Sequence, residues 1–287
     1  MKIFTVGGSG MVGSRFVELL HDKHTFDDLS LTNGVDITDP ATLDVIRNDT
    51  EHEILIHLAA KADVDGCEKD KELGEDGPAY KINVGGTQNV VDACRATNKK
   101  IIYISTDFVF DGKKPAGESY SETDEPNPIN WYARTKYLGE EIVKNSGLPY
   151  LIVRIAFPYR REFEIKKDFV RAIADRLKNN LPIAAITDQY FTPTFIDDIA
   201  LAIDTLIQSN QTGIYHVVGN QSLTPFDASM LIAKQFGLDT NLISTTTGDE
   251  FFKGRAPRPF NLSINNDKIE QLGVVMHNFE EGLQKII

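Results

Sequence analysis

Residues 3–13 are Ile-Phe-Thr-Val-Gly-Gly-Ser-Gly-Met-Val-Gly, a short apolar run that leads into glycine at positions 7, 10 and 13. The run predicts a strand, and the helical spacing of apolar residues after it predicts a helix over 12–21. Glycine tolerates positive φ and lets the backbone approach a phosphate, which the N–H groups at a helix start attract. A turn that is tight for packing alone also selects glycine. Its place between strand and helix favours dinucleotide binding, with the pyrophosphate against Gly7, Gly10, Met11, Val12 and Gly13.

The same strand-then-helix order continues outward from this turn. Runs rich in Val, Ile and Leu predict strands at 29–32, 54–58, 101–105 and 151–155. Amphipathic stretches between them predict helices at 41–48, 80–97 and 132–144. Nearly continuous apolar strands need cover on both faces, and strands that alternate with helices form parallel sheets with right-handed crossovers. The predicted fold class is therefore α/β, a Rossmann-type doubly wound parallel sheet.

The pattern loosens after about residue 156. It predicts helices at 163–177 and 197–207, a strand at 214–218, a helix that Thr224 caps and Pro225 begins, and a polar loop at 248–259. We expect residues 1–157 to form the dinucleotide-binding core, joined by further elements from about 188–218. The rest of 158–287 is expected to form a smaller, discontinuous substrate-binding lobe over the carboxyl ends of the strands, where open α/β sheets bind ligands.

Composition excludes several function classes. Thirty Lys and Arg stand against 42 Asp and Glu, a net charge of −12 across 287 residues, which disfavours nucleic-acid and membrane-surface roles. No apolar run reaches the roughly 20 residues of a membrane span, and the first residues lack a secretory pattern, so we expect a cytoplasmic protein. Cys67 and Cys94 are too few for a disulfide framework or a cysteine-based metal site, and no metal is expected.

Tyr132 and Lys136 lie four residues apart in the predicted helix 132–144, so their side chains share one face. A free tyrosine, with a pKa of about 10, is a poor acid at neutral pH, but a neighbouring ammonium stabilises the phenolate and lowers that pKa. The pair therefore has the chemistry of a proton donor. Tyr and Lys also meet at this spacing by chance on helix surfaces, so the weight of the pair depends on the motifs around it.

Those motifs, in this order, resemble the extended short-chain dehydrogenase/reductase superfamily. The resemblance implies that Thr106 hydrogen-bonds the substrate oxygen beside Tyr132, with Ser105 behind it, and that Asn83 supports Lys136 through a helix and water. It also places further residues at a nicotinamide cofactor, namely Asn33, Asp36, Ile37, Leu58, Ala59, Ala60 and Ser105, together with Tyr132 and Lys136. The nearby His57 sits inside a strand and is interpreted as a core residue rather than a base.

The choice of cofactor depends on the residues after the second strand. An acidic residue there would hold the ribose 2′-hydroxyl of NAD(H) and repel a 2′-phosphate. Thr32-Asn33-Gly34 is neutral, and Arg15 is either a 2′-phosphate ligand or a solvated surface charge. These residues favour NADP(H), with NAD(H) as the alternative.

Ser105-Thr-Asp-Phe-Val-Phe-Asp-Gly112 is similar to a motif of the dTDP-4-dehydrorhamnose reductase family, and the similarity continues in Val64-Asp65, Arg134-Thr-Lys136 and Ala256-Pro-Arg-Pro259. It implies reduction of dTDP-4-dehydrorhamnose to dTDP-L-rhamnose. It also implies that Asp107, Phe108 and Phe157 face the sugar and that Arg255 and Arg258 hold the diphosphate. The sequence does not decide whether the protein forms a homodimer or whether a magnesium ion lies at the dimer interface.

The chain departs from that family where the sugar would bind. Phe108 replaces a tyrosine, Ala62 a threonine and Phe157 a tryptophan, and Trp131 is unusual before Tyr132. Two other functions therefore remain as alternatives. One is another nucleotide-sugar epimerase or dehydratase. The other is a non-catalytic NADP-binding subunit similar to the regulatory subunit of methionine adenosyltransferase, which would not need the Tyr-Lys pair.

Overall fold

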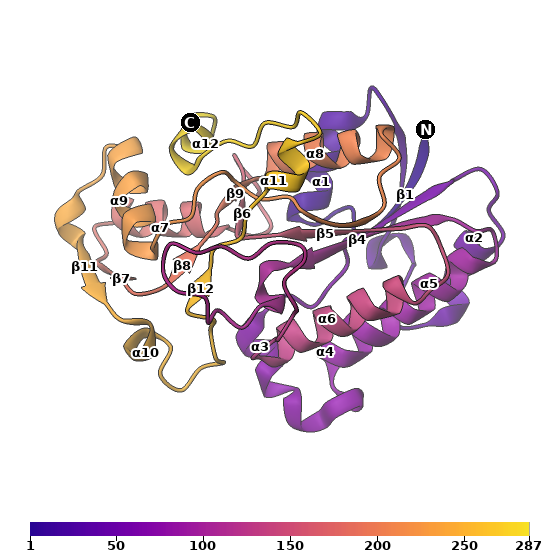
Figure 1. The fold of residues 1–287 in the computed structure, drawn as a ribbon, viewed down its shortest axis with the longest axis horizontal. Helices are drawn as coiled ribbons and strands as arrows, with labels where there is room; N and C mark the ends of the chain where they lie inside the picture. Colours follow the sequence, from indigo (N-terminus) through magenta and orange to yellow (C-terminus); the bar gives the residue numbers. More distant parts are fainter. Residues whose placement is uncertain (287) are drawn as a thin grey trace.

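The computed structural model describes residues 1–286. Its centre is a six-stranded parallel sheet in the order β10-β5-β4-β3-β1-β2 (Figure 1). The strands are β1 (Lys2–Val6), β2 (Thr25–Leu29), β3 (Ile54–His57), β4 (Lys100–Thr106), β5 (Tyr150–Ile155) and β10 (Gly213–His216). After β1 the chain forms β2 on one side of β1 and then crosses to form β3 on the other side. The direction in which strands are added to the sheet therefore reverses between β1 and β3. Connections diverge at such a point and leave a crevice there.

Helices cover both faces of this sheet, as a doubly wound fold requires. One face carries α1 (Met11–Leu20), α8 (Ile196–Gln208) and α11 (Asp267–Glu270); the other carries α2 (Asp44–Arg47), α5 (Thr87–Arg95) and α6 (Trp131–Lys144) (Figure 1). Two apolar cores result, one under each helical layer. The predicted fold class is confirmed.

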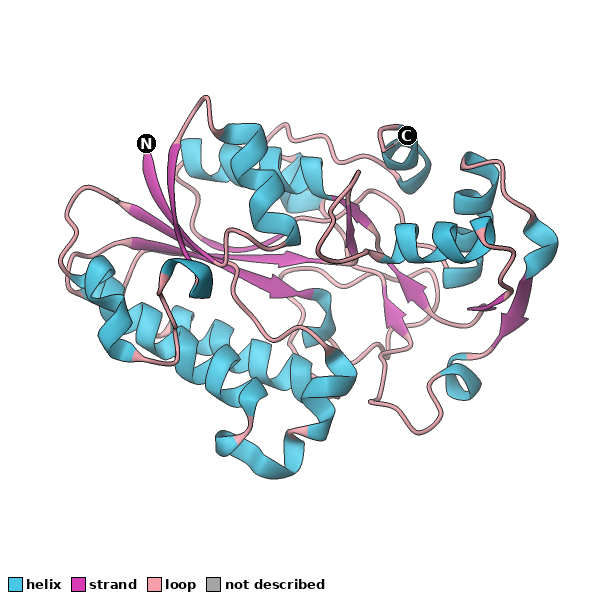
Figure 2. Ribbon diagram, turned by 180° about the vertical axis from the view of Figure 1, so that it is seen from behind, coloured by secondary structure: helices cyan, strands magenta, loops and turns pink. Residues whose placement is uncertain are grey.

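A smaller group of elements lies beyond the carboxyl ends of the strands, toward which the arrows of the sheet point in Figure 2. Its strands pair as β6 (Pro158–Tyr159) with β9 (Thr194–Phe195), β7 (Ile183–Ile186) with β11 (Ile243–Thr246), and β8 (Tyr190–Phe191) with β12 (Asn261–Leu262). Its helices are α7 (Phe169–Lys178), α9 (Pro225–Gln235), α10 (Gly248–Phe251) and α12 (Phe279–Gln284). A third apolar core, rich in phenylalanine, holds them together.

The second predicted strand is wrong. β2 spans Thr25–Leu29, and Leu31–Asn33 is a short 3-10 helix. β2 is the edge of the sheet, so polar residues such as Asp27 and Asp28 are accommodated in it, and the apolar signal that predicts a buried strand is weak.

Other predicted elements differ at their ends. The helix predicted at 80–97 consists of α4 (Pro78–Tyr80), a π-helical stretch η4 (Lys81–Gly86) and α5, because the chain widens by one residue per turn around Asn83. The helix predicted at 41–48 begins as a 3-10 turn η2 (Pro40–Leu43) before α2. The helix predicted at 163–177 starts only at Phe169, because the Asp168 side chain caps it. The predicted strand 214–218 ends at His216, and the predicted loop 248–259 contains the single turn α10.

Several predictions agree closely with the structure. α9 begins at Pro225, with Thr224 in a capping box, and α6 and α8 match the predicted ranges to within one residue. The remaining elements are short: α3 (Val64–Lys69), η1 (Leu31–Asn33), η3 (Lys71–Asp76), η5 (Asp107–Val109) and η6 (Thr240–Leu242). Within residues 1–286, none of the helices has both the length and the apolar composition needed to cross a membrane.

Candidate active site

The glycine turn joins β1 to α1 at the reversal point of the sheet. Gly7 has φ +81°, and a Cβ built on it would lie 2.8 Å from the backbone nitrogen of Ala59, which follows β3. The Gly8 N–H donates to the Asp28 carboxylate at 2.7 Å, which fixes the turn against β2. Gly10 caps α1 without a side-chain hydrogen bond, so the first N–H groups of the helix are free to bind an anion.

A cleft of about 500 Å³ runs along this turn. It contains many of the residues predicted at a cofactor: Gly7, Gly10, Asp36, Ile37, Leu58, Ala59 and Ala60. Other predicted residues do not line it. Met11 and Val12 pack against the core, Gly13 packs against Gly8, and the Asn33 amide donates to the Asp28 carbonyl at 2.9 Å.

Thr32, considered above for the choice of cofactor, lines the cleft as well. Sequence reasoning missed other lining residues, and all of them except Ile82 lie near the misplaced second strand or the glycine turn: Val6, Ser9, Leu29, Ser30, Leu31, Val35, Thr38 and Ile82. Arg15, considered above as a ligand for a 2′-phosphate, is instead engaged by Asp197 of α8. Its Nε and Nη2 donate to the two carboxylate oxygens at 2.7 and 2.6 Å.

Gly7→Ala is expected to destabilise the protein more than Gly147→Ala. Both glycines have positive φ, +81° and +77°, but a Cβ on Gly147 would meet nothing within 4 Å. The backbone strain, about 1–2 kcal/mol, is common to both, and overpacking against Ala59 should add about 1–3 kcal/mol for Gly7 alone. Urea denaturation of the two variants measures the difference. Equal losses in the free energy of unfolding would show that the approach to Ala59 is not tight.

Tyr132 lies in the first turn of α6, at the carboxyl end of β4. The Asn130 side chain caps this helix by accepting from the Ala133 N–H at 2.9 Å, and its amide donates to the Pro257 carbonyl at 3.0 Å. Burial raises the pKa of the Tyr132 phenol well above its usual value, while a hydrogen bond with the side chain of Thr106 acts in the opposite direction. The predicted lowering of this pKa by Lys136 is therefore wrong: the phenol is protonated at neutral pH and lies beside a hydroxyl.

The buried Lys136 side chain lies one helical turn further along α6. Its Nζ donates to the Ile104 carbonyl at 2.7 Å and lies 4.0 Å from the centroid of the Tyr103 ring. Burial lowers the pKa of Lys136 to about 7, and the charge of Glu140 acts to raise it. Lys136 is thus balanced between its charged and neutral forms near neutral pH.

Asn83 contacts the helix of Lys136 rather than Lys136 itself. Its amide nitrogen donates to Thr135 Oγ1 at 2.9 Å and to the Lys61 carbonyl at 3.1 Å, and its oxygen accepts from the Lys61 N–H at 2.8 Å. The π-helical stretch around Asn83 directs this side chain between α6 and the segment after β3. Asn83 therefore fixes α6 relative to the Ala59–Ala60 side of the cleft.

The end of β4 supplies the hydroxyl beside Tyr132. Thr106 donates to Asp107 Oδ1 at 3.0 Å and accepts from the Phe108 N–H at 3.3 Å. Asp107 is almost fully buried, and burial raises the pKa of its carboxyl to about 7. Ser105 is also buried, one residue before Thr106.

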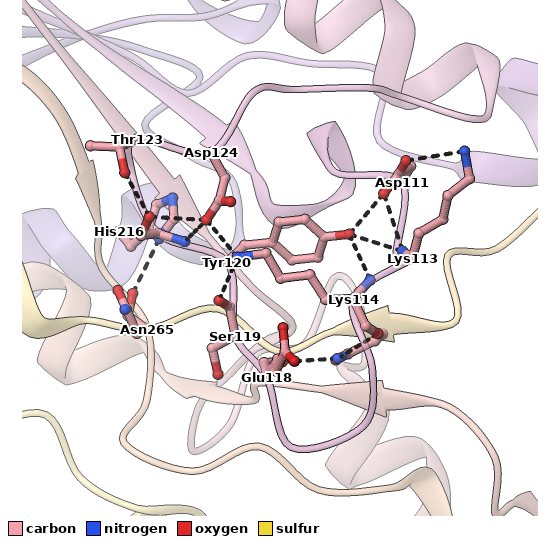
Figure 3. Close-up of polar contacts among 12 residues, drawn as sticks. Asp111, Lys113, Lys114, Glu118, Ser119, Tyr120, Thr123, Asp124, His216 and Asn265 are labelled. Carbon is pink, nitrogen blue, oxygen red and sulfur yellow. Dashed lines mark hydrogen bonds and ion pairs between the residues drawn. The ribbon is translucent and has the colours of Figure 1, made fainter.

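The connection from β4 to α6 is organised around Tyr120 (Figure 3). Its hydroxyl donates to Asp111 at 2.7 Å and accepts from the Lys113 N–H at 2.9 Å, while Lys114 pairs with Asp124 at 2.8 Å. These contacts hold the segment that carries Phe108 and Asp107 in a fixed position.

A buried ion pair lies behind the site. Glu140 of α6 and Arg154 of β5 form two hydrogen bonds, Nε to Oε1 at 2.9 Å and Nη2 to Oε2 at 2.7 Å, and both side chains are at most 1% exposed. The Arg154 guanidinium also lies 5.1 Å from the Phe110 ring. The pair connects α6, and with it Tyr132 and Lys136, to the centre of the sheet.

An apolar cavity of about 370 Å³ opens between this site and the smaller lobe. Phe108, Phe157 and Arg258, all predicted to face a substrate, line it. Arg255 does not. Both arginines are held by Asp65 of α3, Arg255 at 2.6 Å and Arg258 at 2.8 Å, and this pairing lowers the pKa of Asp65 to about 2.

His57 is buried, and burial lowers the pKa of its imidazole to about 3, so it is a neutral core residue. Within residues 1–286, no three His, Cys, Asp or Glu side chains gather closely enough to hold a metal ion.

The doubly wound sheet, the glycine turn and the Tyr132–Lys136 pair beside Thr106 define an extended short-chain dehydrogenase/reductase. Residues 1–287 match the sequence profile of the family described as RmlD substrate binding domain. The chain therefore belongs to the RmlD family of this superfamily.

Individual relatives show how far the similarity extends. The chain is 29% identical over 298 residues to the probable low-salt glycan biosynthesis reductase Agl14 of Haloferax volcanii, across 99% of this chain and 96% of that one. It is 28% identical over 258 residues to methionine adenosyltransferase 2 subunit beta of Mus musculus, across 88% and 74% of the two chains. The crystal structure of a Bacillus anthracis dTDP-4-dehydrorhamnose reductase in complex with NADP superimposes with a TM-score of 0.89 at 30% identity, covering 99% and 98%.

Proposed function

We propose that this protein is an NAD(P)H-dependent reductase of the 4-keto group of a nucleotide-activated deoxysugar, converting dTDP-4-dehydrorhamnose to dTDP-L-rhamnose. The observation that carries the proposal is the position of the Tyr132 phenol, beside Thr106 and one helical turn from Lys136. In this proposal residues 1–157, with elements from about 188–218, bind the cofactor. The remainder of 158–287 binds the nucleotide-sugar, and the enzyme acts in the cytoplasm.

The cleft along the glycine turn fits a dinucleotide. The uncapped start of α1 suits the pyrophosphate, and Gly7, with φ +81° and no side chain, forms the tight turn beside it. Asp36 and Ile37 line the part of the cleft where the adenine would lie. When bound, the nicotinamide supplies the hydride for the carbonyl carbon.

Tyr132 and the side chains around it have separate roles in the reduction. Tyr132 gives its proton to the carbonyl oxygen as negative charge develops there. The Thr106 hydroxyl, turned from Asp107 toward the same oxygen, would donate a hydrogen bond to it and stabilise that charge. Lys136 in its ammonium form stabilises the phenolate that remains. Arg258, at the cavity, and Arg255 beside it would hold the diphosphate, which must share or replace their contacts with Asp65.

We favour NADP(H) over NAD(H) as the cofactor. β2 ends at Leu29, and the lining residues that follow, Ser30 and Thr32, are neutral hydroxyl donors. Asp28, the acidic residue nearest the end of β2, already accepts hydrogen bonds from Gly8 and Thr5. These neutral hydroxyls accommodate a 2′-phosphate without charge repulsion.

Spectrophotometric oxidation of NADPH and NADH tests the proposal, with dTDP-4-keto-6-deoxyglucose as substrate and its 3,5-epimerase present. We expect turnover with both cofactors and a higher kcat/KM with NADPH. No turnover with either would contradict the proposed reaction. It would favour a regulatory subunit, the role suggested by the similarity to methionine adenosyltransferase 2 subunit beta. Cofactor that copurifies and is not consumed would indicate an epimerase or dehydratase.

Cofactor binding is expected to take up a proton above pH 7. Burial lowers the pKa of Lys136 to about 7. Because Lys136 is expected to contact the cofactor, bound cofactor should favour the ammonium form of Lys136 and raise its pKa. Affinity is then constant below pH 7 and falls with rising pH above it, by at most about tenfold per pH unit for a single proton.

Calorimetric titration at pH 8, in two buffers with different ionisation enthalpies, counts the protons taken up. Lys136→Met should abolish the uptake, whereas Lys144→Met, a more exposed position on the same helix, should retain it. Equal uptake by the wild type and Lys136→Met would refute the assignment to Lys136.

A further inference from the structure

The wall of the apolar cavity next to Tyr132 is made of aromatic rings. Phe108 lies edge to face with Tyr132, with ring centroids 5.9 Å apart, and Phe157 lies 5.9 Å from Phe108. Phe191 continues the wall, 4.6 Å from Phe157. A substrate whose carbonyl reaches the Tyr132 phenol must therefore place its neighbouring atoms against phenylalanine.

The position of the Phe157 ring is enforced by its surroundings. Phe157 has φ +39°, in the left-handed region that bulky residues avoid. Such strain persists only where packing overdetermines the conformation, and it concentrates at functional sites. Phe157 packs against Phe169 and Phe191 of the smaller lobe as well as against Phe108. The ring is thus held in the wall and cannot easily give way to a polar neighbour.

The polar side chains that line the cavity come from other segments. Among the described lining residues, only Gln189, Tyr190 and Arg258 carry polar side-chain groups. Gln189 and Tyr190 lie at β8, and Arg258 follows α10. Arg258 already donates to Asp65 at 2.8 Å and to the Ala256 carbonyl at 2.7 Å. The cavity is therefore apolar over most of its lining, including Phe108 and Phe157 beside Tyr132, and its few polar groups come from residues 189, 190 and 258.

We propose that the sugar this site selects lacks a ring hydroxyl at C2 or C3 in addition to the one at C6. This inference rests on the proposed reaction, reduction of a 4-keto group on a nucleotide-linked deoxysugar, and makes a 4-keto dideoxyhexose, rather than dTDP-4-dehydrorhamnose, its preferred substrate. A ring hydroxyl turned toward Phe108 and Phe157 would lose its water without gaining a partner. The C–H edge of a deoxygenated ring carbon suits an aromatic face. The C5 methyl group can cover one ring of the wall but not Phe108, Phe157 and Phe191 together.

The experiment compares kcat/KM for dTDP-4-dehydrorhamnose with that for its 2-deoxy and 3-deoxy counterparts, using the same cofactor. We expect one deoxy substrate to exceed the parent by about 10–100-fold, since an apolar pocket rejects an added hydroxyl only to about that extent. A parent that equals or exceeds both deoxy compounds would overturn the inference and leave the reductase proposal intact. No turnover of any of the three would remove the proposed function, and the inference with it.

Phe108→Tyr adds one hydroxyl to the wall of the cavity and provides a second test of the proposal. It should raise kcat/KM for the parent about tenfold relative to the preferred deoxy substrate, since a paired hydroxyl replaces an unpaired one. Phe26→Tyr, a half-buried position on the remote edge strand β2, is the matched control and should leave the ratio unchanged. An unchanged ratio in Phe108→Tyr would show that this ring does not face the sugar.

Discussion

Tyr132→Phe is expected to lower kcat for carbonyl reduction by about 10²–10⁴-fold, the usual contribution of a positioned general acid. The substitution removes only the hydroxyl, so the ring and its edge-to-face contact with Phe108 remain. Because a single hydroxyl is lost and the ring keeps its place, the Kd for NADPH should change less than twofold.

The control is Tyr137→Phe, on the same helix. Tyr137 is half-buried, and its ring lies 6.0 Å from the Arg134 guanidinium rather than at the end of β4. The Tyr137→Phe variant should retain the kcat of the wild type. Single-turnover kinetics with prebound NADPH would assign the loss in Tyr132→Phe to the chemical step. Activity retained in Tyr132→Phe would exclude this phenol as the proton donor and direct attention to Asp107, whose carboxyl has a pKa raised to about 7 by burial.

The placement of Tyr132 beside Lys136 on one helix could be predicted from the sequence because the spacing of the two residues is local. Tyr132 and Lys136 share a helix face by periodicity alone, and the glycine turn is a feature of consecutive residues. The same holds for α9, whose start follows from Thr224 and Pro225. Local patterns of this kind survive folding because neighbours in sequence stay neighbours in space.

The rest of the site depends on partners that are distant in sequence. Arg255 and Arg258 pair with Asp65, some 190 residues earlier, and no pattern in residues 248–259 predicts which carboxylate they meet. The strand β2 is misplaced by the sequence pattern because an edge strand tolerates polar residues, and the error conceals Ser30 as a lining residue. Likewise, the π-helical stretch that directs Asn83 toward Thr135 is invisible in a pattern that is apolar at helical spacing throughout.

The ion pair behind the site depends both on a local sequence pattern and on a contact between residues that are distant in sequence. Glu140 lies one helical turn beyond Lys136, as Lys136 lies beyond Tyr132, so periodicity alone places all three along one helix face. Only the fold shows that Arg154 of β5 meets Glu140 with both partners buried. The charge of Glu140 also acts to raise the pKa of Lys136, so the pair affects the chemistry as well as the packing.

Glu140→Gln is expected to destabilise the fold by about 3–5 kcal/mol, because it leaves the charge of Arg154 buried without a counter-charge. The side chain keeps its size and one acceptor, but its amide nitrogen would face an Arg154 N–H, so the loss reports the charge together with one of the two hydrogen bonds. For a chain of 287 residues that corresponds to a fall in Tm of roughly 5–8 °C. Thermal and urea unfolding would measure it.

Glu141→Gln is the control, because the adjacent Glu141 forms only a partly exposed pair with Lys144 and should cost about 0.5 kcal/mol or less. Removing both charges in Glu140→Leu with Arg154→Met should restore much of the stability, since well-packed apolar pairs often replace buried ion pairs at little cost. The double variant should nevertheless take up its cofactor-linked proton at a lower pH than the wild type, because Lys136 loses the charge that raises its pKa. A double variant as unstable as Glu140→Gln would mean that the geometry of the pair, rather than its unbalanced charge, supports α6 against the sheet.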